Sequence, residues 1–439
     1  MKVFIVSFSL VEGGAAIAAR KFYNILLRGA RTEVLRIVAD SAADNEESKL
    51  GLCYAFHFFK RVFSLGLLKL MADANPVKHS LNIFSSRNLL SYLRSEKQQP
   101  NPEAIFNFHW FNNDLLSIFR LSMIPKFSII TLHDEWLFCG AEHYADVENQ
   151  NPFFRDGYRF FQDGVRGINW NYVIWWLKCR QLNGRNDLII TVPSSWMLER
   201  AKSSVVLEGK DIRLLPNPIP TDVFYPALAD EKERLRVMFG LSKQDVVICL
   251  GAVNGQHNPL KGHDIAEKAL LHLKSIAAPE LLEKVCLVFF GSGKFDEGVF
   301  HGFRMINAGK VSSASDMRNL YAMCDWTLVP SKVEAFGQVA AESLACETPV
   351  VAFKSSGLQD VVVDGVSGFL AEPFCYKSYA KCIMNGLLMS HDSREIIGKS
   401  GRLHVEEKFS VHVVQARYIA VLKDALVRKR QMIKSDYDV

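Results

Sequence analysis

Apolar runs typical of buried strands alternate with runs of helical spacing along this chain of 439 residues. Near the start, residues 2–6 read as a strand, 15–27 as a helix and 34–38 as a second strand. A strand, a helix and a strand in that order predict two parallel strands joined by a crossover helix. The alternation restarts at residues 246–250, which are followed by helical spacing over 265–273. The pattern therefore predicts an α/β fold with parallel sheets.

Two domains are expected from the length, because the chain exceeds one ordinary domain of about 100 to 200 residues. The hydrophobic content of 49% is sufficient for two cores. Three prolines stand within residues 216–220, at mid-chain, and residues 222–226 follow them. We place the linker there, so that an N-terminal domain covers residues 1–221 and a C-terminal domain covers residues 222–415.

Charge and cysteine content exclude several classes of protein. The formal net charge of +5 is mild and no block of like charge stands out, which does not favour a nucleic-acid partner. The nine cysteines show no CxxC pair or zinc-like spacing, as expected of thiols in a reducing compartment. No signal core precedes the first strand, and no charge-free apolar run approaches the roughly 20 residues of a membrane span. We expect a cytoplasmic protein that can touch a membrane surface.

Residues 52–70 form an aromatic run of helical spacing that includes three cations, Lys60, Arg61 and Lys69. A helix of this kind can lie in a membrane interface, with its apolar side chains among the lipids. It can also pack against the predicted sheet, and we favour this second interpretation. A Trp-rich run over residues 169–182 could either pack or border an acceptor groove, and packing is again favoured.

The run from Glu334 to Glu342 follows a strand-like segment, residues 326–331, and leads into helical spacing that begins close to Gly337. The first backbone N–H groups of a helix have no partner within it, and with the helix dipole they form a site for phosphate. Glu334 precedes this helix whereas Glu342 lies inside it. The two acids can therefore contact different parts of an extended, phosphate-bearing ligand. The alternative is a solvated helix face with a capping acid.

Polar residues follow two predicted strands, at the edge where open α/β sheets bind ligands. His109 follows residues 104–108, and His133 follows residues 127–132. Such histidines are often structural, but here further polar and aromatic side chains accompany them. These side chains are Asp134, Trp136 and His143.

Two further loops can approach a ligand closely. Gly13 and Gly14 follow the first strand, where the missing side chains admit a ligand or form a tight turn. Lys261 precedes the helix at residues 265–273 and offers a mobile cation for a diphosphate leaving group. An exposed lysine without a role is the alternative.

Several of these stretches resemble glycosyltransferase family 4, whose members are retaining enzymes with the GT-B fold, two Rossmann-like domains facing a cleft. In the C-terminal half the resemblance lies in Pro330, Ser331 and the runs 334–342, 346–352 and 357–370. In the N-terminal half it lies in Gly13, Gly14 and residues 109–144. The run from His133 to Tyr144 resembles a signature of bacterial members that build surface polysaccharides.

The resemblance implies a role for each candidate residue. The expected catalytic residues are His133 facing the transferred sugar, Glu334 on the donor sugar hydroxyls and Lys261 on the diphosphate. Glu342 would hold the ribose. The other expected diphosphate contacts are Gly13, Gly14 and the amides of Phe336, Gly337 and Gln338. The residues expected on the acceptor side are His109, Asp134, Trp136 and His143.

The implied reaction is the transfer of a hexose-type sugar from a UDP- or GDP-sugar to a lipid-linked glycan, in capsule, O-antigen or exopolysaccharide synthesis. It would occur in the cytoplasm or at the cytoplasmic face of the inner membrane. No metal or other cofactor is needed in this scheme, and Asp436, Tyr437 and Asp438 are read as a polar terminus and not as a metal motif. Residues 416–439 would form a helix that returns to the first domain.

One departure from the family concerns the cation near the diphosphate. Relatives often carry an arginine where this chain has Ala252 or Leu260, so Lys261 acts with less help or another cation such as Arg318 replaces the arginine. Three other functions stay open: a 2-epimerase, a non-catalytic subunit that binds sugar nucleotides, and a dinucleotide oxidoreductase. The last is disfavoured because Asp296 stands where the third glycine of a GxGxxG motif would fall.

Overall fold

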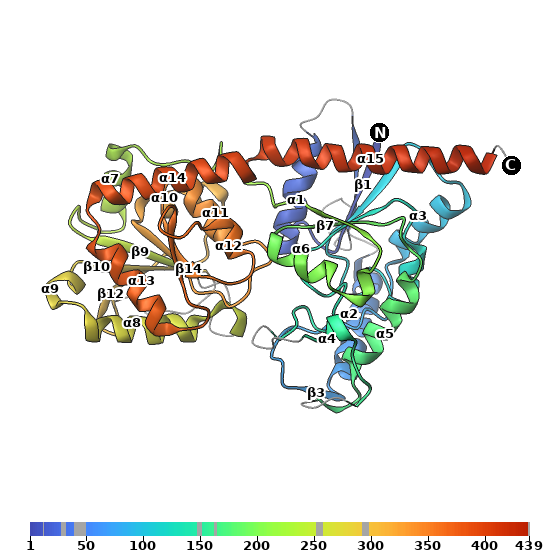
Figure 1. Ribbon diagram of the computed structural model, residues 1–439, viewed down its shortest axis with the longest axis horizontal. Helices are drawn as coiled ribbons and strands as arrows, with labels where there is room; N and C mark the ends of the chain where they lie inside the picture. The colour runs from blue at the N-terminus through green and yellow to red at the C-terminus, as the bar shows by residue number, and fades with distance from the viewer. Residues whose placement is uncertain are drawn as a thin grey trace. The chain divides into compact units, whose positions relative to one another are not determined.

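The computed structural model describes residues 1–11, 13–27, 32–38, 50–146, 152–161, 165–251, 258–291 and 298–437. The chain divides into two compact units, Met1–Pro216 with Gln415–Val439, and Asn217–Val414. Each unit is built on a largely parallel sheet covered by helices, as the sequence predicts (Figure 1). Ala252, Asp296 and Asp438 lie outside the described residues.

The first unit contains a six-stranded parallel sheet with the order β2-β1-β4-β5-β7-β8. Its strands are β1 (Lys2–Ser7), β2 (Glu33–Val38), β4 (Ala104–Phe108), β5 (Ile129–Thr131), β7 (Ile189–Val192) and β8 (Asp211–Leu214). A separate antiparallel pair consists of β3 (Met71–Asp73) and β6 (Val165–Gly167). The helical segments are α1 (Gly14–Leu27), α2 (Leu50–Leu68), α3 (Arg87–Gln98), η1 (Ile118–Met123), α4 (Phe153–Asp156), α5 (Trp170–Leu182), α6 (Ser195–Lys202) and η2 (Val205–Leu207).

The central strands of this sheet are covered on both faces. Every residue of β4, β5 and β7 is buried, which is why these strands read as continuous apolar runs and not as alternating ones. α1 buries Ala18, Phe22 and Ile25, which recur at helical spacing. α5 buries Ile174 and Leu177, so one face of the Trp-rich run packs, but Trp176 is 43% exposed and lies outside this packed face. With the faces covered, the loops at the carboxyl ends of the strands are the place for ligands.

The last helix, α15 (Val411–Tyr437), packs on the first unit. Asn107 of β4 donates a hydrogen bond of 2.7 Å to the Tyr418 hydroxyl, and both side chains are buried. Farther along the helix, Asp424 forms an ion pair with Arg213 of β8. The end of the chain is therefore tied to both a central strand and the edge strand of the sheet.

The second unit contains a seven-stranded sheet with the order β11-β12-β10-β9-β13-β14-β15, in which only β11 is antiparallel to its neighbour among the described strands. Its strands are β9 (Val246–Gly251), β10 (Val285–Phe290), β11 (Gly298–Phe300), β12 (Phe303–Asn307), β13 (Trp326–Val329), β14 (Val350–Phe353) and β15 (Gly368–Ala371). The helical segments are α7 (Ala229–Met238), η4 (Pro259–Lys261), α8 (His263–Ile276), α9 (Pro279–Leu282), α10 (Ala314–Met323), α11 (Gln338–Ala345), α12 (Leu358–Val361), α13 (Tyr376–Leu388) and α14 (His391–Phe409).

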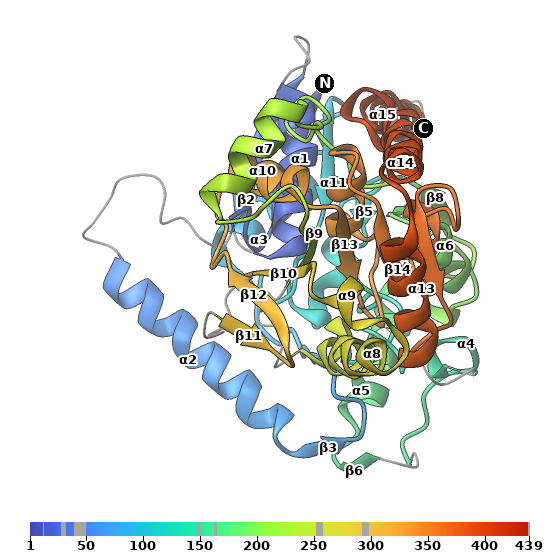
Figure 2. The ribbon, with the colours of Figure 1, turned by 90° about the vertical axis from the view of Figure 1, so that its left-hand side faces the viewer.

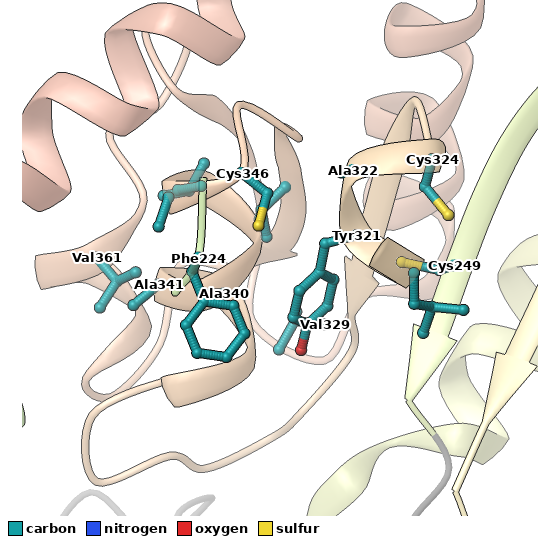
Figure 3. Close-up of a cluster of buried hydrophobic side chains, with 14 of the residues drawn as sticks. Phe224, Cys249, Tyr321, Ala322, Cys324, Val329, Ala340, Ala341, Cys346 and Val361 are labelled. Atoms are coloured by element: carbon teal, nitrogen blue, oxygen red, sulfur yellow. The ribbon is translucent and has the colours of Figure 1, made fainter. Parts of the chain in front are cut away.

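The central strands of this unit divide their side chains between two cores. Val247 and Cys249 of β9 pack with α10, α11 and α14, whereas Ile248 and Leu250 pack with α8 and α13. Alternation with a period of two is a property of strands, and it places helices on both faces of the sheet. In the first core Tyr321 points between Cys249 and helix α11 (Figure 3). The large buried ring therefore fixes α11 against the sheet.

The described side chains of α2 correct one expectation. Phe59, Val62, Phe63 and Leu65 are 49–68% exposed, and Figure 2 shows the helix extending away from the sheet of its unit. The favoured interpretation, packing against the sheet, is therefore wrong for this part of the helix. Within the described ranges, no helix combines the length and the apolarity that a membrane span requires.

Candidate active site

Three strands of the first sheet end beside one another, because β1, β4 and β5 are parallel neighbours. The loops after them carry Gly13 and Gly14, His109 and His133. The His109 amide donates to the Val6 carbonyl at 2.8 Å, which fixes this residue at the end of β4. Gly13 has a φ of +94°, a conformation that favours glycine, and Gly14 begins α1. The structure thus brings these sequence-predicted residues to one edge of the sheet.

Asp134 is the centre of a hydrogen-bond network at this edge. Its Oδ2 accepts from Trp110 Nε1 at 2.9 Å and from His143 Nδ1 at 2.6 Å, and its Oδ1 accepts from the Trp136 amide at 3.0 Å. Burial raises the pKa of Asp134, but the charge and hydrogen bond of His143 together with the hydrogen bonds from Trp136 and Trp110 outweigh it, and the net pKa is lowered. Asp134 is therefore an ionised carboxylate that orients its neighbours.

Trp136 and His143 are both buried and both meet Ser80. His143 Nε2 lies 2.8 Å from the Ser80 hydroxyl, and Trp136 Nε1 donates to the Ser80 carbonyl at 2.9 Å. Burial is the main cause that lowers the pKa of His143, and the charge of Asp134 opposes it. Of the residues expected on the acceptor side, Trp136 and His143 therefore hold the loop that carries His133 in place through Ser80. Ser80 was missed in the sequence because it stands in no motif.

Buried charges hold the same loop from its other side. Glu135 is fully buried and forms an ion pair with Arg200 of α6. Lys178 of α5 is also fully buried, and its ammonium group donates to the carbonyls of Trp136, Cys139 and Gly140. Burial lowers the pKa of Lys178 to about 7. A buried donor that satisfies three carbonyls fixes the turn, because each would otherwise be left without a partner.

His133 lies half-buried in this loop, and its Nε2 is 3.0 Å from Nδ1 of His109. Burial lowers the pKa of His133 to about 4, and the charge of Asp134 opposes this shift only in part. The Tyr144 hydroxyl donates to the His133 carbonyl at 3.3 Å and steadies the backbone. The imidazole is therefore neutral near pH 7, and it can act through hydrogen bonds and not as a cation.

The second unit brings Lys261 and Glu334 together. The Lys261 ammonium lies 2.6 Å from Oε1 of Glu334, and the two side chains are 38% and 19% exposed. The loops that carry them are also joined by the backbone, because the Lys332 amide donates to the Leu260 carbonyl at 2.8 Å. Gly262, with a φ of +64°, lies directly against the carbonyl of Pro330. A side chain at this position would separate the loops.

Glu334 is held in place by hydrogen bonds to both its side chain and its backbone. The Ser331 hydroxyl donates to Oε1 at 2.8 Å, and the Ser356 hydroxyl accepts from the Glu334 amide at 3.0 Å. The Gly357 amide donates to the Glu334 carbonyl at 2.9 Å. Ser356 and Gly357 follow β14, so two neighbouring strands of the sheet position this acid.

Gly337 begins α11, as predicted, with a φ of +106°. A methyl group here would lie 2.8 Å from Cδ2 of Leu358, so both conformation and space require glycine. Among the described residues, no acceptor is found for the amides of Phe336, Gly337 or Gln338. The Phe336 side chain is buried against Phe409, with ring centroids 5.1 Å apart. Only its backbone is therefore available to a ligand.

Glu342 lies inside α11 and is 7% exposed. Its Oε1 accepts from Gln338 Nε2 at 2.9 Å. The buried hydroxyl of Tyr321 has no hydrogen-bond partner within the described chain. Burial and then the charge of Glu342 raise the pKa of Tyr321 well above its ordinary value. Glu342 therefore lies near the buried hydroxyl of Tyr321, and it contacts Gln338 at the start of α11.

Arg318 does not replace the missing arginine. Its guanidinium pairs with Glu231 and donates to the carbonyls of Tyr225 and Pro226, both at 2.9 Å. The side chain is 3% exposed and holds α10 against α7. In the described part of the chain, no group of three His, Cys, Asp or Glu side chains is arranged as a metal site.

Comparison with known sequences assigns a domain to the second unit. Residues 240–404 match the family Glycosyl transferases group 1. The sulfoquinovosyl transferase SQD2 of Arabidopsis thaliana is 26% identical over 248 residues, 55% of this chain and 45% of that protein. A D-inositol 3-phosphate glycosyltransferase of Xylanimonas cellulosilytica is 31% identical over 53% of this chain and 56% of that protein. CapM of Staphylococcus aureus, a capsular polysaccharide biosynthesis glycosyltransferase, is 32% identical over 27% of this chain and 32% of that protein.

Comparison with solved structures covers nearly the whole chain. A sucrose-phosphate synthase of Thermosynechococcus elongatus aligns with a TM-score of 0.63 over 98% of this chain and 100% of that chain, at 15% identity. HepE of Anabaena, solved in complex with UDP, aligns with a TM-score of 0.59 over 97% of this chain and 100% of that one, at 16% identity. The predicted GT-B fold is confirmed, and the second unit carries a group 1 glycosyltransferase domain. The chain spans about half the length of the first two curated relatives.

Replacing Gly262 by alanine should destabilise the second unit by about 2 to 4 kcal/mol, because a left-handed backbone and a collision with the Pro330 carbonyl act together. The matched control is Gly240→Ala, since Gly240 has a φ of +65° and open space around its Cα. This control should cost only about 1 kcal/mol. Urea unfolding of both variants measures the difference, and equal losses would contradict the close approach of the two loops.

Proposed function

We propose that this chain is a retaining glycosyltransferase that moves a hexose-type sugar from a nucleoside diphosphate-sugar to an acceptor hydroxyl. The observation that carries the proposal is the Lys261–Glu334 pair. Glu334 stands in the loop that leads directly into the start of α11. A cation and backbone amides suit a diphosphate, and a fixed carboxylate suits sugar hydroxyls. On this proposal the second unit binds the donor and the first unit binds the acceptor.

The reaction breaks the bond between the anomeric carbon and a diphosphate oxygen, and it forms a bond from that carbon to the acceptor oxygen. The diphosphate leaves with the bonding electron pair, so negative charge develops on it. Lys261 and the amides of Phe336, Gly337 and Gln338 would stabilise this charge, and preorganised donors can contribute about 3 to 4 kcal/mol each. The acceptor proton passes to the departing phosphate on the same face of the sugar, which gives retention. With Lys261 as the cation, this scheme needs no metal ion.

The remaining candidate residues take positions around the same substrates. We assign Glu342 to the ribose hydroxyls and the Gly13–Gly14 turn to the diphosphate. His133 is proposed to bind the transferred sugar, and its neutral state suits a hydrogen bond to a hydroxyl. The residues assigned to the acceptor side are His109, Asp134, Trp136 and His143, of which the last three shape the loop that carries His133.

The relatives support a narrower proposal for the substrates. Because HepE was solved with UDP, a UDP-sugar is a suitable first donor to test, followed by GDP-sugars. We propose a product in capsule, O-antigen or exopolysaccharide synthesis, and the likeness to CapM, a capsular polysaccharide biosynthesis glycosyltransferase, supports the first of these. Such products are assembled on lipid carriers, which would place the enzyme in the cytoplasm, at the membrane surface.

The described part of α2 supports a contact with that membrane. Phe59, Val62 and Phe63 expose apolar surface, and the cations Arg61 within α2 and Lys69 directly after it are exposed. Helices that combine aromatic and basic side chains bind to anionic membrane interfaces. We propose that this segment holds the enzyme near a lipid-linked acceptor.

The variant Lys261→Ala should lower the rate of nucleotide release from the cognate donor sugar by a factor of about 100 or more, because charge on the leaving diphosphate loses its cation. The matched control is Lys268→Ala, an exposed lysine on α8. The assay supplies UDP- and GDP-sugars with a glycan acceptor and records the anomeric configuration of the product by NMR. Equal rates in the two variants would remove Lys261 from the site. Release without transfer, an epimerised donor or an inverted product would contradict the proposed reaction.

The double variant Phe59→Ser with Phe63→Ser should weaken binding to vesicles that contain phosphatidylglycerol by roughly tenfold or more, because two apolar side chains lose their burial in the interface. The control is Leu388→Ser with Leu403→Ser, two exposed leucines of the second unit. Co-sedimentation measures both. The membrane proposal fails if the wild type does not sediment with the vesicles, or if the two double variants bind equally.

A further inference from the structure

The contact between His109 and His133 uses one nitrogen of each ring. Nδ1 of His109 lies 3.0 Å from Nε2 of His133, and the rings are nearly parallel, with an interplanar angle of 16°. His109 is 2% exposed and its position is fixed by its backbone bond to Val6. With so little exposed surface, His109 serves the acceptor side through its contact with His133 and not by touching an acceptor itself.

The other nitrogen of His109 lacks a partner among the described residues. Its Nε2 is buried and has no hydrogen-bond partner within the described chain. The ring of Phe22 lies against His109 with a centroid distance of 5.5 Å, and Tyr418 packs edge-on behind Phe22 at 5.0 Å. This environment decides which nitrogen of His109 can carry a proton.

Two neutral imidazoles share a single proton across a hydrogen bond, so only two arrangements are possible. In the first, His109 donates from Nδ1, its Nε2 is an unprotonated acceptor, and His133 carries its own proton on Nδ1. In the second, His133 donates from Nε2, and His109 carries its proton on the buried Nε2. The second arrangement leaves an N–H donor buried without an acceptor, and orphaned donors are rarer in proteins than under-satisfied acceptors. Geometry and burial therefore favour the first arrangement.

We infer that His109 is a positioning residue which donates its Nδ1 proton to Nε2 of His133, so that His133 presents an N–H group at Nδ1 to the substrate. Within the described residues, no hydrogen bond is formed by Nδ1 of His133. Asp134 does not compete for the ring, because its oxygens accept from Trp110, Trp136 and His143. The catalytic meaning of the inference rests on the proposed function.

The inference specifies what His133 can do in the proposed reaction. With Nε2 occupied as an acceptor and Nδ1 protonated, the ring is a hydrogen-bond donor toward a sugar oxygen. It is not a base that removes the proton of the acceptor, since the free lone pair is already used by His109. Because burial lowers the pKa of His133 to about 4, the ring stays neutral across the neutral pH range, and the hydrogen bond with His109 selects between its two tautomers.

Nitrogen-15 NMR of histidine-labelled protein tests the inference without any substrate. The chain has 12 histidines, and His133→Asn identifies the signal of His133 by its disappearance. The expected wild-type spectrum shows His133 protonated at Nδ1 and unprotonated at Nε2. His109→Asn places an amide N–H at the position of Nδ1 and should keep this tautomer, whereas His109→Leu should shift the population towards protonated Nε2.

The rate of sugar transfer provides a second test of the inference. His109→Leu should lower kcat by roughly tenfold, the effect of one lost orienting hydrogen bond, with an unchanged KM for the donor. His109→Asn should restore kcat to within about threefold. A wild-type His133 protonated at Nε2, or a His109→Leu variant with the wild-type tautomer and rate, would overturn the inference. If no donor is turned over at all, the proposed function fails while the spectra still decide the tautomer.

Discussion

Backbone amides that have no acceptor among the described residues at the start of α11 are the constraint around which the second unit is arranged. The chain turns at Gly337 with a left-handed backbone, a conformation that favours glycine. A side chain at this position would also meet Leu358. Tyr321 fixes the helix against the sheet from below. The turn after β14 holds Glu334 in front of the helix. Two sheet strands and one core thus serve to present a few N–H groups shortly after Glu334, the acid that pairs with Lys261.

In the first unit, a polar loop has to be placed at the edge of a buried sheet. Glu135 and Lys178 are fully buried ionisable groups, and each is satisfied, by Arg200 in one case and by backbone carbonyls in the other. Buried charges are costly unless they are paired in this way, and removal of one partner is strongly destabilising. The loop that carries His133 is therefore held rigidly before any ligand arrives. A rigid site of this kind avoids an ordering cost on binding.

Local patterns explain which parts of this arrangement could be predicted from the sequence. The start of α11 at Gly337 and the strand before His133 follow from spacing over a few residues, so they were found. Ser80 meets His143 across 63 residues, and Lys178 meets the Cys139 carbonyl across 39 residues. No local signal marks such partners. For α2 the helix was predicted correctly and its packing against the sheet was not. An apolar run specifies a helix but does not say what covers it.

The central claim is that the second unit recognises a diphosphate through amides and a lysine, and not mainly through the base. Thermal unfolding in the presence of UDP, GDP and ADP, each compared with its own nucleoside, tests this claim directly. The account predicts that at least one diphosphate, at about 100 times its Kd, raises the Tm by roughly 5 °C, while the matching nucleoside has little effect. Equal shifts with nucleoside and diphosphate, or no shift with any of the three diphosphates, would contradict it.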